Sequence, residues 1–277
     1  MSGARRALGR AGLGGAGALL ALAFLAPYLV MLFTAAKPEA ELRVTPPRLT
    51  PLVWHWTNFA AVLRDGEFQT WLRVSLVVAL ASMALVVAAA VPAAYYTARH
   101  RFRGRTAFLF LVLVTQMFSP TSLVVGLHRE FFELDLINTY TALILTNAAF
   151  NLAFAIWILR AFFASIPREI EEAAAVDGCG RLRVLVRIVL PLSRPGLVTA
   201  AIFAFIAAWN EYIVALTLMT DPDKKPLTVG VTSYVTAYVQ HWNSLFAASI
   251  IAIVPVVVLF ILIERYLVGG LTAGSVK

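Results

Sequence analysis

The sequence is short of charge and almost without cysteine. Only 14% of its 277 residues are charged, against about 25% in average soluble proteins, while 60% are hydrophobic and the mean hydropathy is +0.81. So few charges cannot cover the surface of a soluble protein of this length, which indicates a membrane protein. A single cysteine, Cys179, excludes an internal disulfide, and the four histidines are scattered, so we expect no metal site.

A phosphate-binding loop is also missing from the sequence. None of the four lysines stands in the G-x-x-x-x-G-K-[ST] context. Residues 12–17 satisfy G-x-G-x-x-G, but a dinucleotide site needs a preceding strand and a following amphipathic helix, and this segment has neither. Small residues at the start of a membrane helix are the better interpretation. We therefore expect a chain that is not an enzyme and has no cofactor of its own.

Six long windows are nearly free of charge, and they predict the fold. Glu211 is the one charged residue in them, and it lies in the fifth window. The windows cover residues 11–36, 74–98, 106–128, 136–159, 195–220 and 226–263. A bilayer core needs about 20 helical residues, and helices satisfy every backbone group within the segment. The expected fold is an all-α polytopic membrane protein with six transmembrane helices, the last near Leu245–Tyr266.

The basic residues predict the orientation of the spans. If the N-terminus is inside, fifteen of the 23 Lys and Arg residues fall on inner segments. The positive-inside rule then favours both termini in the cytoplasm. The net charge of +8 is a topology signal, and it requires no nucleic acid. The first window begins like a signal peptide, but it is long and lacks a clear cleavage site, so we expect an uncleaved helix.

The longest expected cytoplasmic loop, residues 161–194, is polar. Pro167 suits the first turn of a helix, the alanines that follow favour helix, and Gly178 predicts its end. A second amphipathic segment runs over 182–190, with Pro191 expected to end it. The prediction is two short helices with a glycine corner. From periodicity alone, a hairpin lying on lipid headgroups fits as well as one that docks on a protein partner.

The spacing within this loop is more specific than its periodicity. Glu172-Ala173-Ala174, Gly178, Ile188 and Leu190-Pro191 match, at every position, the Glu-Ala-Ala loop of bacterial ABC importer permeases, which the chain resembles. The segments IFAFIAAWNEYIVAL, LDLINTYTALIL and GLTAGSVK extend the likeness to the carbohydrate branch, with its maltose-type and glycerol-3-phosphate-type subunits. Two departures are Cys179-Gly180 at the corner and Val74 before Ser75.

This resemblance implies the transmembrane domain of an ABC type I importer in the bacterial cytoplasmic membrane. It implies an N-terminal part (1–70), a five-helix core (71–266) that contains the loop 161–194, and a tail (267–277). The implied partners are a second homologous permease, two copies of a cytoplasmic ATPase that use ATP and Mg, and an external solute-binding protein. Membrane lipid surrounds the chain, and a carbohydrate is the implied substrate.

The resemblance also assigns a role to the loop. Glu172 would meet a basic residue in a cleft of the ATPase, the alanines would allow close packing, and Gly178 would shape the corner. The residues implied to couple the loop to the ATPase are Glu171, Glu172, Ala173, Ala174, Asp177, Gly178, Ile188, Leu190 and Pro191.

Glu211 is the one ionisable side chain well inside a predicted span. A central acid costs about 2.5–3.5 kcal/mol on insertion scales, so it should face protein or water. One interpretation is a substrate pathway at Trp209, Asn210, Glu211 and Tyr212, with rings for a pyranose face and polar groups for hydroxyls. A structural hydrogen bond or ion pair is the equally weighted alternative. A proton-coupled secondary transporter is the alternative function, although such proteins usually need several embedded ionisable groups.

Overall fold

The computed structural model describes residues 2–236 and 240–272, and the side chains of residues 14–236 and 240–263. Within these ranges the chain is helical, and an isolated antiparallel bridge between Val235 and Gln240 is its one extended pairing. The chain divides into two compact units. The first contains Met1–Phe68 and Val231–Val254, and the second contains Gln69–Gly230 and Pro255–Lys277.

Four helices are long and apolar enough to cross a membrane, which agrees with four of the expected spans. The helices are α1 (Ser2–Ala35), α4 (Gly66–Arg99), α7 (Tyr140–Ser165) and α14 (Trp242–Thr272). The apolar parts of α1 and α14 are Gly14–Ala35 and Trp242–Ile263.

The two remaining expected spans are bent rather than continuous. In the first, α5 (Arg105–Thr115) and α6 (Pro120–Glu133) meet at 93°. Ser119 is held in an extended conformation by the proline that follows it, so the helix stops before Pro120 and a new one begins there. In the second, the segment Arg181–Leu192 meets α11 (Arg194–Trp209) at 81°. If each bent pair crosses once, the described chain has six spans.

The first unit is held by polar contacts around the end of α1. It includes α2 (Glu39–Leu42), α3 (Thr57–Arg64) and the turn η3 (Val231–Tyr234). Asn58 donates to the carbonyls of Ala35 and Lys37 at 2.8 and 2.9 Å, and the buried Lys37 ammonium donates to the Arg48 carbonyl. The Tyr234 hydroxyl donates to Asp65 at 2.7 Å. Burial, together with this carboxylate, raises the pKa of Tyr234.

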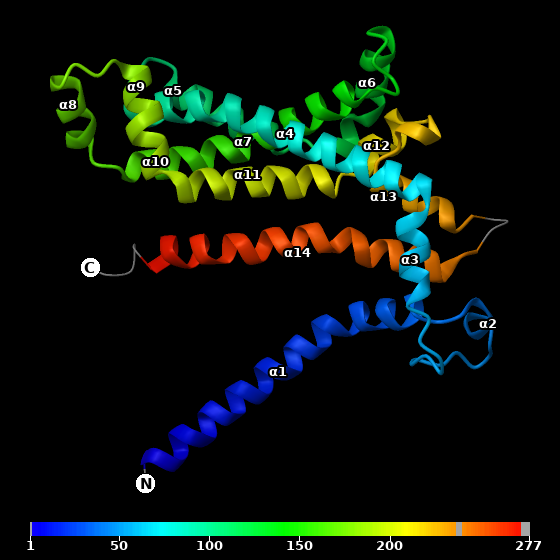
Figure 1. Cartoon of the computed structure of the whole chain (residues 1–277). Helices are drawn as coiled ribbons and strands as arrows, with labels where there is room; N and C mark the ends of the chain where they lie inside the picture. Colours follow the sequence, from blue (N-terminus) through cyan, green and yellow to red (C-terminus); the bar gives the residue numbers. More distant parts are fainter. Residues whose placement is uncertain (1, 237–239, 273–277) are drawn as a thin grey trace. The chain divides into compact units, whose positions relative to one another are not determined.

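The second unit is built on three long helices, α4, α7 and α11, which lie side by side in Figure 1. They share one hydrophobic core, with small residues at many of the contact positions: Val86, Ala90, Ala94, Ala155, Ile156, Leu159, Ala200 and Ala204. The close approach of α7 and α11 depends on Gly196. A Cβ placed there would lie 2.4 Å from the Phe162 ring.

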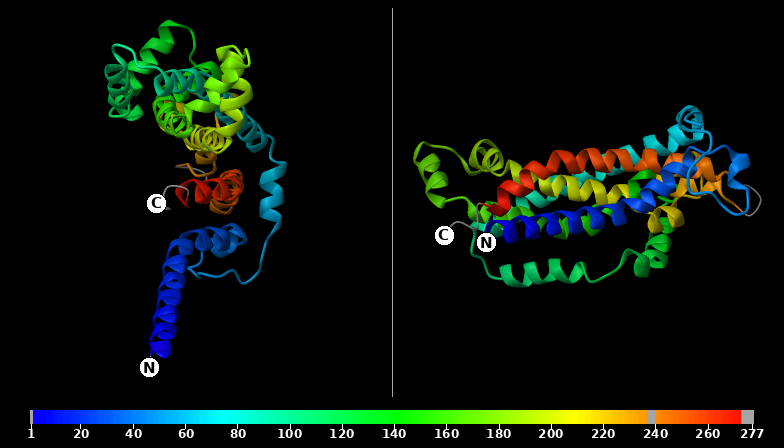
Figure 2. Two further views of the ribbon diagram at one scale, coloured as in Figure 1. Left: turned by 90° about the vertical axis from the view of Figure 1, so that its left-hand side faces the viewer. Right: turned by 90° about the horizontal axis from the view of Figure 1, so that it is seen from below.

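Short elements occupy the two ends of this unit. At one end lie α8 (Arg168–Val176) and α9 (Arg181–Val184), as Figure 1 and the right-hand view of Figure 2 show. At the other end lie α12 (Ile213–Leu218), the turn η2 (Pro222–Lys224) and α13 (Leu227–Gly230). A second hydrophobic cluster joins α12 to α4, α6 and α7 there, through residues such as Val74, Phe131, Leu143 and Leu218. The α8–α9 end and the α12 end are therefore connected by the same long helices.

Candidate functional site

The first arm of the expected loop is the helix α8, and Gly178 forms its end. Gly178 has φ +79°, in the left-handed region that favours glycine. The N–H of Gly178 donates to the Ala175 carbonyl at 3.1 Å, and the N–H of Cys179 donates to the Ala174 carbonyl at 2.9 Å. These two bonds are the Schellman pattern, which satisfies the last carbonyls of a helix. The predicted glycine corner is present.

The second arm differs from the prediction, because Pro191 does not end it. Helix α9 continues through a π-helical turn, η1 (Leu185–Val189), into α10 (Leu190–Leu192). Proline normally stops a helix, since its ring clashes with the carbonyl four residues earlier and it lacks an N–H. Here the π turn has already changed the hydrogen-bond spacing before Pro191, and the helix ends at Leu192, with Ser193 as its C-cap. We call the segment 168–192 the hairpin.

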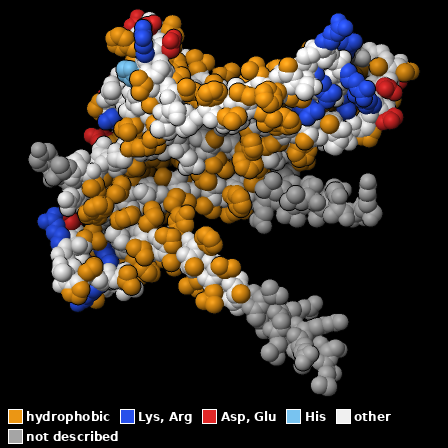
Figure 3. Space-filling view, turned by 180° about the vertical axis from the view of Figure 1, so that it is seen from behind, with side chains coloured by type: hydrophobic (Ala, Val, Ile, Leu, Met, Phe, Trp, Pro, Cys, Tyr) orange, Lys and Arg blue, Asp and Glu red, His pale blue; other side chains and the backbone are white. Residues whose placement is uncertain are grey.

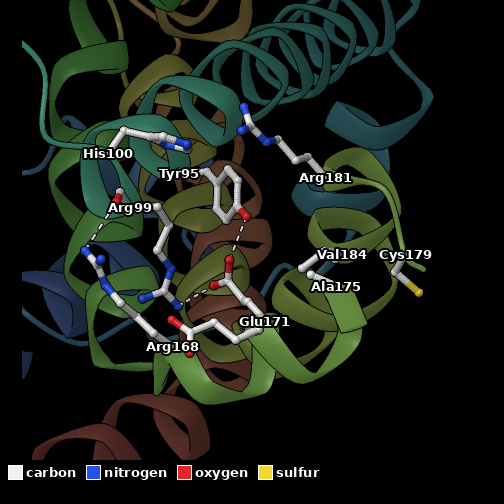
Figure 4. Close-up of a pocket in the computed structure, with 10 residues that line it drawn as sticks. Tyr95, Arg99, His100, Arg168, Glu171, Ala175, Cys179, Arg181 and Val184 are labelled. Atoms are coloured by element: carbon white, nitrogen blue, oxygen red, sulfur yellow. Dashed lines mark hydrogen bonds and ion pairs between the residues drawn. The ribbon is translucent and has the colours of Figure 1, made fainter. Parts of the chain in front are cut away.

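The hairpin is fastened to α4 by a buried cluster of polar side chains (Figure 4). The Glu171 carboxylate pairs with the Arg99 guanidinium at 2.6 Å and accepts a hydrogen bond from the Tyr95 hydroxyl at 2.7 Å. Arg99 also donates to the Ile166 carbonyl at 3.0 Å, and Arg168 donates to the Arg99 carbonyl at 3.2 Å. We call Tyr95, Arg99 and Glu171 the clamp.

Glu172 lies beside the clamp but is exposed. It lines a cavity of about 220 Å³ together with Tyr95, Arg99, His100, Arg168, Glu171, Ala175, Cys179, Arg181 and Val184. Among the side chains that the structure describes, the Glu172 carboxylate has no hydrogen-bond or ion-pair partner. The two adjacent glutamates therefore differ: Glu171 is engaged within the chain, and Glu172 remains available.

The alanines of the hairpin also face different ways. Ala174 is buried and packs into the core of the second unit, whereas Ala173 is exposed. Ile188 and Leu190 are half-buried against the same core, and Asp177, Gly178 and Pro191 are exposed. Exposed apolar side chains stand near the corner, with Val176 88% and Leu182 74% exposed. The hairpin thus has an inner face packed on its own chain and an outer face that nothing within the described chain covers.

Charge and apolar surface are separated along the second unit. Figure 3 shows hydrophobic side chains along its length and a group of basic side chains at the end that carries the hairpin. The arginines of the hairpin itself that are exposed are Arg168, Arg181, Arg183 and Arg187. This distribution is the one expected for a helical bundle crossing a membrane, with a basic polar end.

The contacts of Tyr95 and Arg99 with Glu171 are not predicted by the sequence pattern. Both residues stand at the end of an expected span, where Arg99 was interpreted only as a topology signal. A tyrosine four residues before an arginine at the end of an apolar helix places both on one face. That spacing is the available signal, but the partner residue, Glu171, is fixed only by the tertiary fold.

The predicted span 195–220 is interrupted at Glu211. Helix α11 ends at Trp209, and α12 begins at Ile213. The Glu211 carboxylate accepts hydrogen bonds from the N–H groups of Val214 and Ala215 at 2.7 and 2.9 Å. It therefore caps the N-terminus of α12, where free N–H groups and the helix dipole favour a negative charge. The side chain of Thr228 donates to the Glu211 carbonyl at 2.7 Å and supports the break.

The other three residues of the candidate pathway have separate surroundings. Trp209 is buried and stacks on Phe205, with ring centroids 5.6 Å apart. Tyr212 is half-buried against the cluster around α12. Asn210 is exposed. The four residues are brought together by the break, but they do not present one common polar surface.

Long apolar helices and two bent spans define a multi-pass helical membrane protein, and a polar hairpin stands at one end of its second unit. A family of known proteins matches residues 90–272 and is described as "binding-protein-dependent transport system inner membrane component". The chain belongs to this family. It is a permease subunit of an ABC transporter in the inner membrane, and such subunits are not catalytic.

Individual relatives agree with this assignment over nearly the whole chain. The sulfoquinovosyl glycerol transport system permease protein SmoH of Agrobacterium fabrum is 37% identical, over 95% of this chain and 92% of that protein. The trehalose/maltose transport system permease protein MalG of Thermococcus litoralis is 34% identical, over 94% of each. The fold is similar to a chain in the crystal structure of a bacterial alginate ABC importer, with a TM-score of 0.82 over 96% and 98% of the two chains at 24% identity.

Proposed function

We propose that this chain is a translocating permease of an ATP-driven sugar importer that depends on a solute-binding protein. Support for a sugar comes from the relatives, whose names specify sulfoquinovosyl glycerol, trehalose and maltose, and diacetylchitobiose. Support for a binding protein comes from the family description. The proton-coupled alternative gains nothing from Glu211, whose carboxylate is engaged by two backbone N–H groups rather than aligned with a proton relay.

The hairpin is proposed to dock on a cytoplasmic ATPase, and its outer face carries the argument. Glu172 and Ala173 are exposed on α8, and Val176 and Leu182 expose large apolar area near the corner. Exposed apolar side chains beside an unpaired carboxylate fit a protein cleft that supplies a basic residue. Two ATPase copies, using ATP and Mg, would contact this hairpin and the equivalent one of a second permease.

Movement of the hairpin would reach the spans by two routes. One route is the clamp, which links α8 to α4 through Glu171 and Arg99. The other is the chain itself, because α10 leads through Ser193 directly into α11. ATP-dependent closure of the ATPases would displace the hairpin, and the spans would switch between two arrangements around a shared pathway.

For the substrate, we propose that Asn210 and Glu211 have different roles. The exposed Asn210 amide can bond sugar hydroxyls, while Glu211 maintains the break that presents it. Trp209 is stacked on Phe205 and supports the wall rather than offering a free ring face. Tyr212 is half-buried at the same break and leaves part of its ring for contact.

The test is affinity purification from native membranes in mild detergent, with the co-purifying subunits identified. Wild type should bring an ATPase and a second permease, whereas Glu172→Lys should lose the ATPase and keep the permease. The matched control is Asp223→Lys, another charge reversal at an exposed acid but at the opposite end of the second unit. Retention of the ATPase by Glu172→Lys would contradict the docking role, and purification of the wild type alone would contradict the assembly.

Sugar as the substrate needs its own assay. The purified assembly, reconstituted into vesicles with its solute-binding protein, should accumulate labelled oligosaccharide only when ATP is supplied. Accumulation without ATP under a proton gradient would favour the secondary transporter instead.

A further inference from the structure

A cavity between α5 and α7 contains two arginines and no acidic side chain. Its volume is about 370 Å³, and it is lined by Arg105, Thr106, Leu109, Phe110, Leu113, Trp157 and Arg160. It is separate from both the clamp and the Glu211 break. We call it the α5–α7 pocket.

The polar groups of this pocket lack hydrogen-bond acceptors. The Nε atoms of Arg105 and Arg160 and the Nε1 atom of Trp157 are enclosed by protein atoms and have no partner in the described chain. A ligand in the cavity would therefore meet the terminal nitrogens of the two guanidinium groups. The Arg160 guanidinium lies over the Trp157 ring, 5.5 Å from its centroid. That cation–π contact attracts the charge but does not satisfy its N–H groups. Two arginines line one cavity that has no carboxylate to balance their charge, so the cavity favours a bound anion.

The N-terminus of α5 also favours a bound anion, for a separate reason. Gly104, the N-cap residue, offers no side-chain cap, and the first turn has no acidic residue. The N-terminus of α5 therefore has free N–H groups and the positive end of the helix dipole, with no negative charge beside them. The helix begins instead with Arg105, a cation where an anion is favoured. A phosphate group placed here would bond both the arginines and the helix N-terminus.

The remaining wall is apolar and open. Leu109, Phe110 and Leu113 continue along α5 away from the arginines, and Phe110 is 66% exposed. A free phosphate ion buries no apolar surface against such a wall, whereas an acyl chain does, and that burial is favourable. The ligand chemistry is therefore an anionic head on a hydrocarbon tail. Because α5 and α7 both belong to candidate spans, this pocket lies where phospholipid is abundant.

We propose that the α5–α7 pocket binds an anionic phospholipid. Its phosphate lies between Arg105 and Arg160 at the start of α5, and an acyl chain follows Leu109, Phe110 and Leu113. Lipid binding at this pocket is independent of which solute the protein transports.

The test uses the full chain with its co-purifying subunits and measures the midpoint of thermal unfolding. Three probes are added separately: dioleoyl phosphatidylglycerol, dioleoyl phosphatidylcholine and inorganic phosphate. Phosphatidylglycerol should raise the midpoint in a saturable way, and the other two should not. Native mass spectrometry should show phosphatidylglycerol retained on the permease. Equal stabilisation by phosphatidylcholine would overturn the charge argument, and equal stabilisation by phosphate would overturn the lipid argument.

Variants locate the effect in the pocket. Arg105→Gln and Arg160→Gln should each weaken the apparent affinity for phosphatidylglycerol by about tenfold, the loss expected for one charge-assisted contact. Arg101→Gln and Arg103→Gln are the matched controls, since both arginines are exposed, lie near the start of α5 and are outside the pocket. Unchanged affinity in the pocket variants would disprove the proposal. Absence of any phosphatidylglycerol effect on the wild-type assembly would also overturn the proposal, and this outcome does not depend on whether a variant folds.

Discussion

Glu171 and Arg99 join the hairpin to α4 through an ion pair of 2.6 Å, in which the side chains are 16% and 8% exposed. The residues are far apart in sequence, so their contact fixes how α8 sits on the second unit. Because Tyr95 bonds the second carboxylate oxygen, the charge of Glu171 has a partner at each of its oxygens.

Removal of one partner should therefore loosen the hairpin. Glu171→Gln leaves the Arg99 charge buried and unpaired, a change that costs about 3 kcal/mol for largely buried pairs. We expect faster trypsin cleavage at Arg181, Arg183 and Arg187 in the reconstituted protein. Glu169→Gln, an exposed position on the same helix, is the control and should digest like wild type. Equal digestion of both variants would mean that the clamp does not hold the hairpin.

The corner of the hairpin should tolerate only glycine. Gly178→Ala places a Cβ on a residue with φ +79°, which costs about 1–2 kcal/mol for an L-residue. The neighbouring Gly180→Ala is a matched control, because Gly180 has φ −68° and open space around its Cβ position. We expect Gly178→Ala to lower the thermal unfolding midpoint and the yield of co-purified ATPase, and Gly180→Ala to change neither. A wild-type yield from Gly178→Ala would show that the corner geometry is not required for docking.

The contact between α7 and α11 should be equally intolerant of bulk. Gly196→Ala forces an overlap with Phe162, and overpacking of this kind costs about 1–3 kcal/mol. The midpoint of thermal unfolding should fall, and in a double-mutant cycle Gly196→Ala should cost less in a Phe162→Ala background than in wild type. Gly126→Ala on α6 meets nothing within 4 Å and serves as the control. An equal cost of Gly196→Ala in both backgrounds would mean that the strain arises elsewhere.

Glu211 allows its two interpretations to be separated. Glu211→Ala removes the acceptor of two backbone N–H groups, and loss of such a cap costs about 0.5–2 kcal/mol. Glu211→Gln keeps an acceptor oxygen, so its thermal midpoint should lie nearer to wild type. Transport should follow the same order if the role is structural. If both variants lose sugar uptake at unchanged stability, Glu211 contacts the substrate.

Composition and spacing predicted the class of fold and the hairpin, because both depend on local pattern. Each of the four long helices overlaps one of the windows without charge, and Gly178 terminates α8 just after its last residue, Val176. The breaks were less predictable. Pro120 marks a possible helix boundary, but the apolar composition continues across it and predicts one unbroken span. The interruption at Glu211 depends on its side chain folding back onto α12.

Contacts between residues far apart in the chain could not be predicted from sequence pattern. Nothing near Glu171 in the sequence identifies Arg99 as its partner. The Glu-Ala-Ala motif begins at Glu172, whereas the glutamate that pairs within the chain is its neighbour, Glu171. The continuation of the helix past Pro191 likewise depends on the π turn before it. Such features follow from how helices pack, which a single sequence does not specify.

The fit of Gly196 against Phe162 limits how the second unit can move. A ring seated where only a hydrogen fits prevents α11 from sliding along α7, because any shift along the axis would bring a larger residue against the ring. Helix α11 is also bounded by two interruptions, at Ser193 and at residues 210–212. Helix α11 is thus one unbroken segment between two interruptions. Under the proposed function, a displacement of the hairpin would therefore reach Asn210 as a tilt of α11.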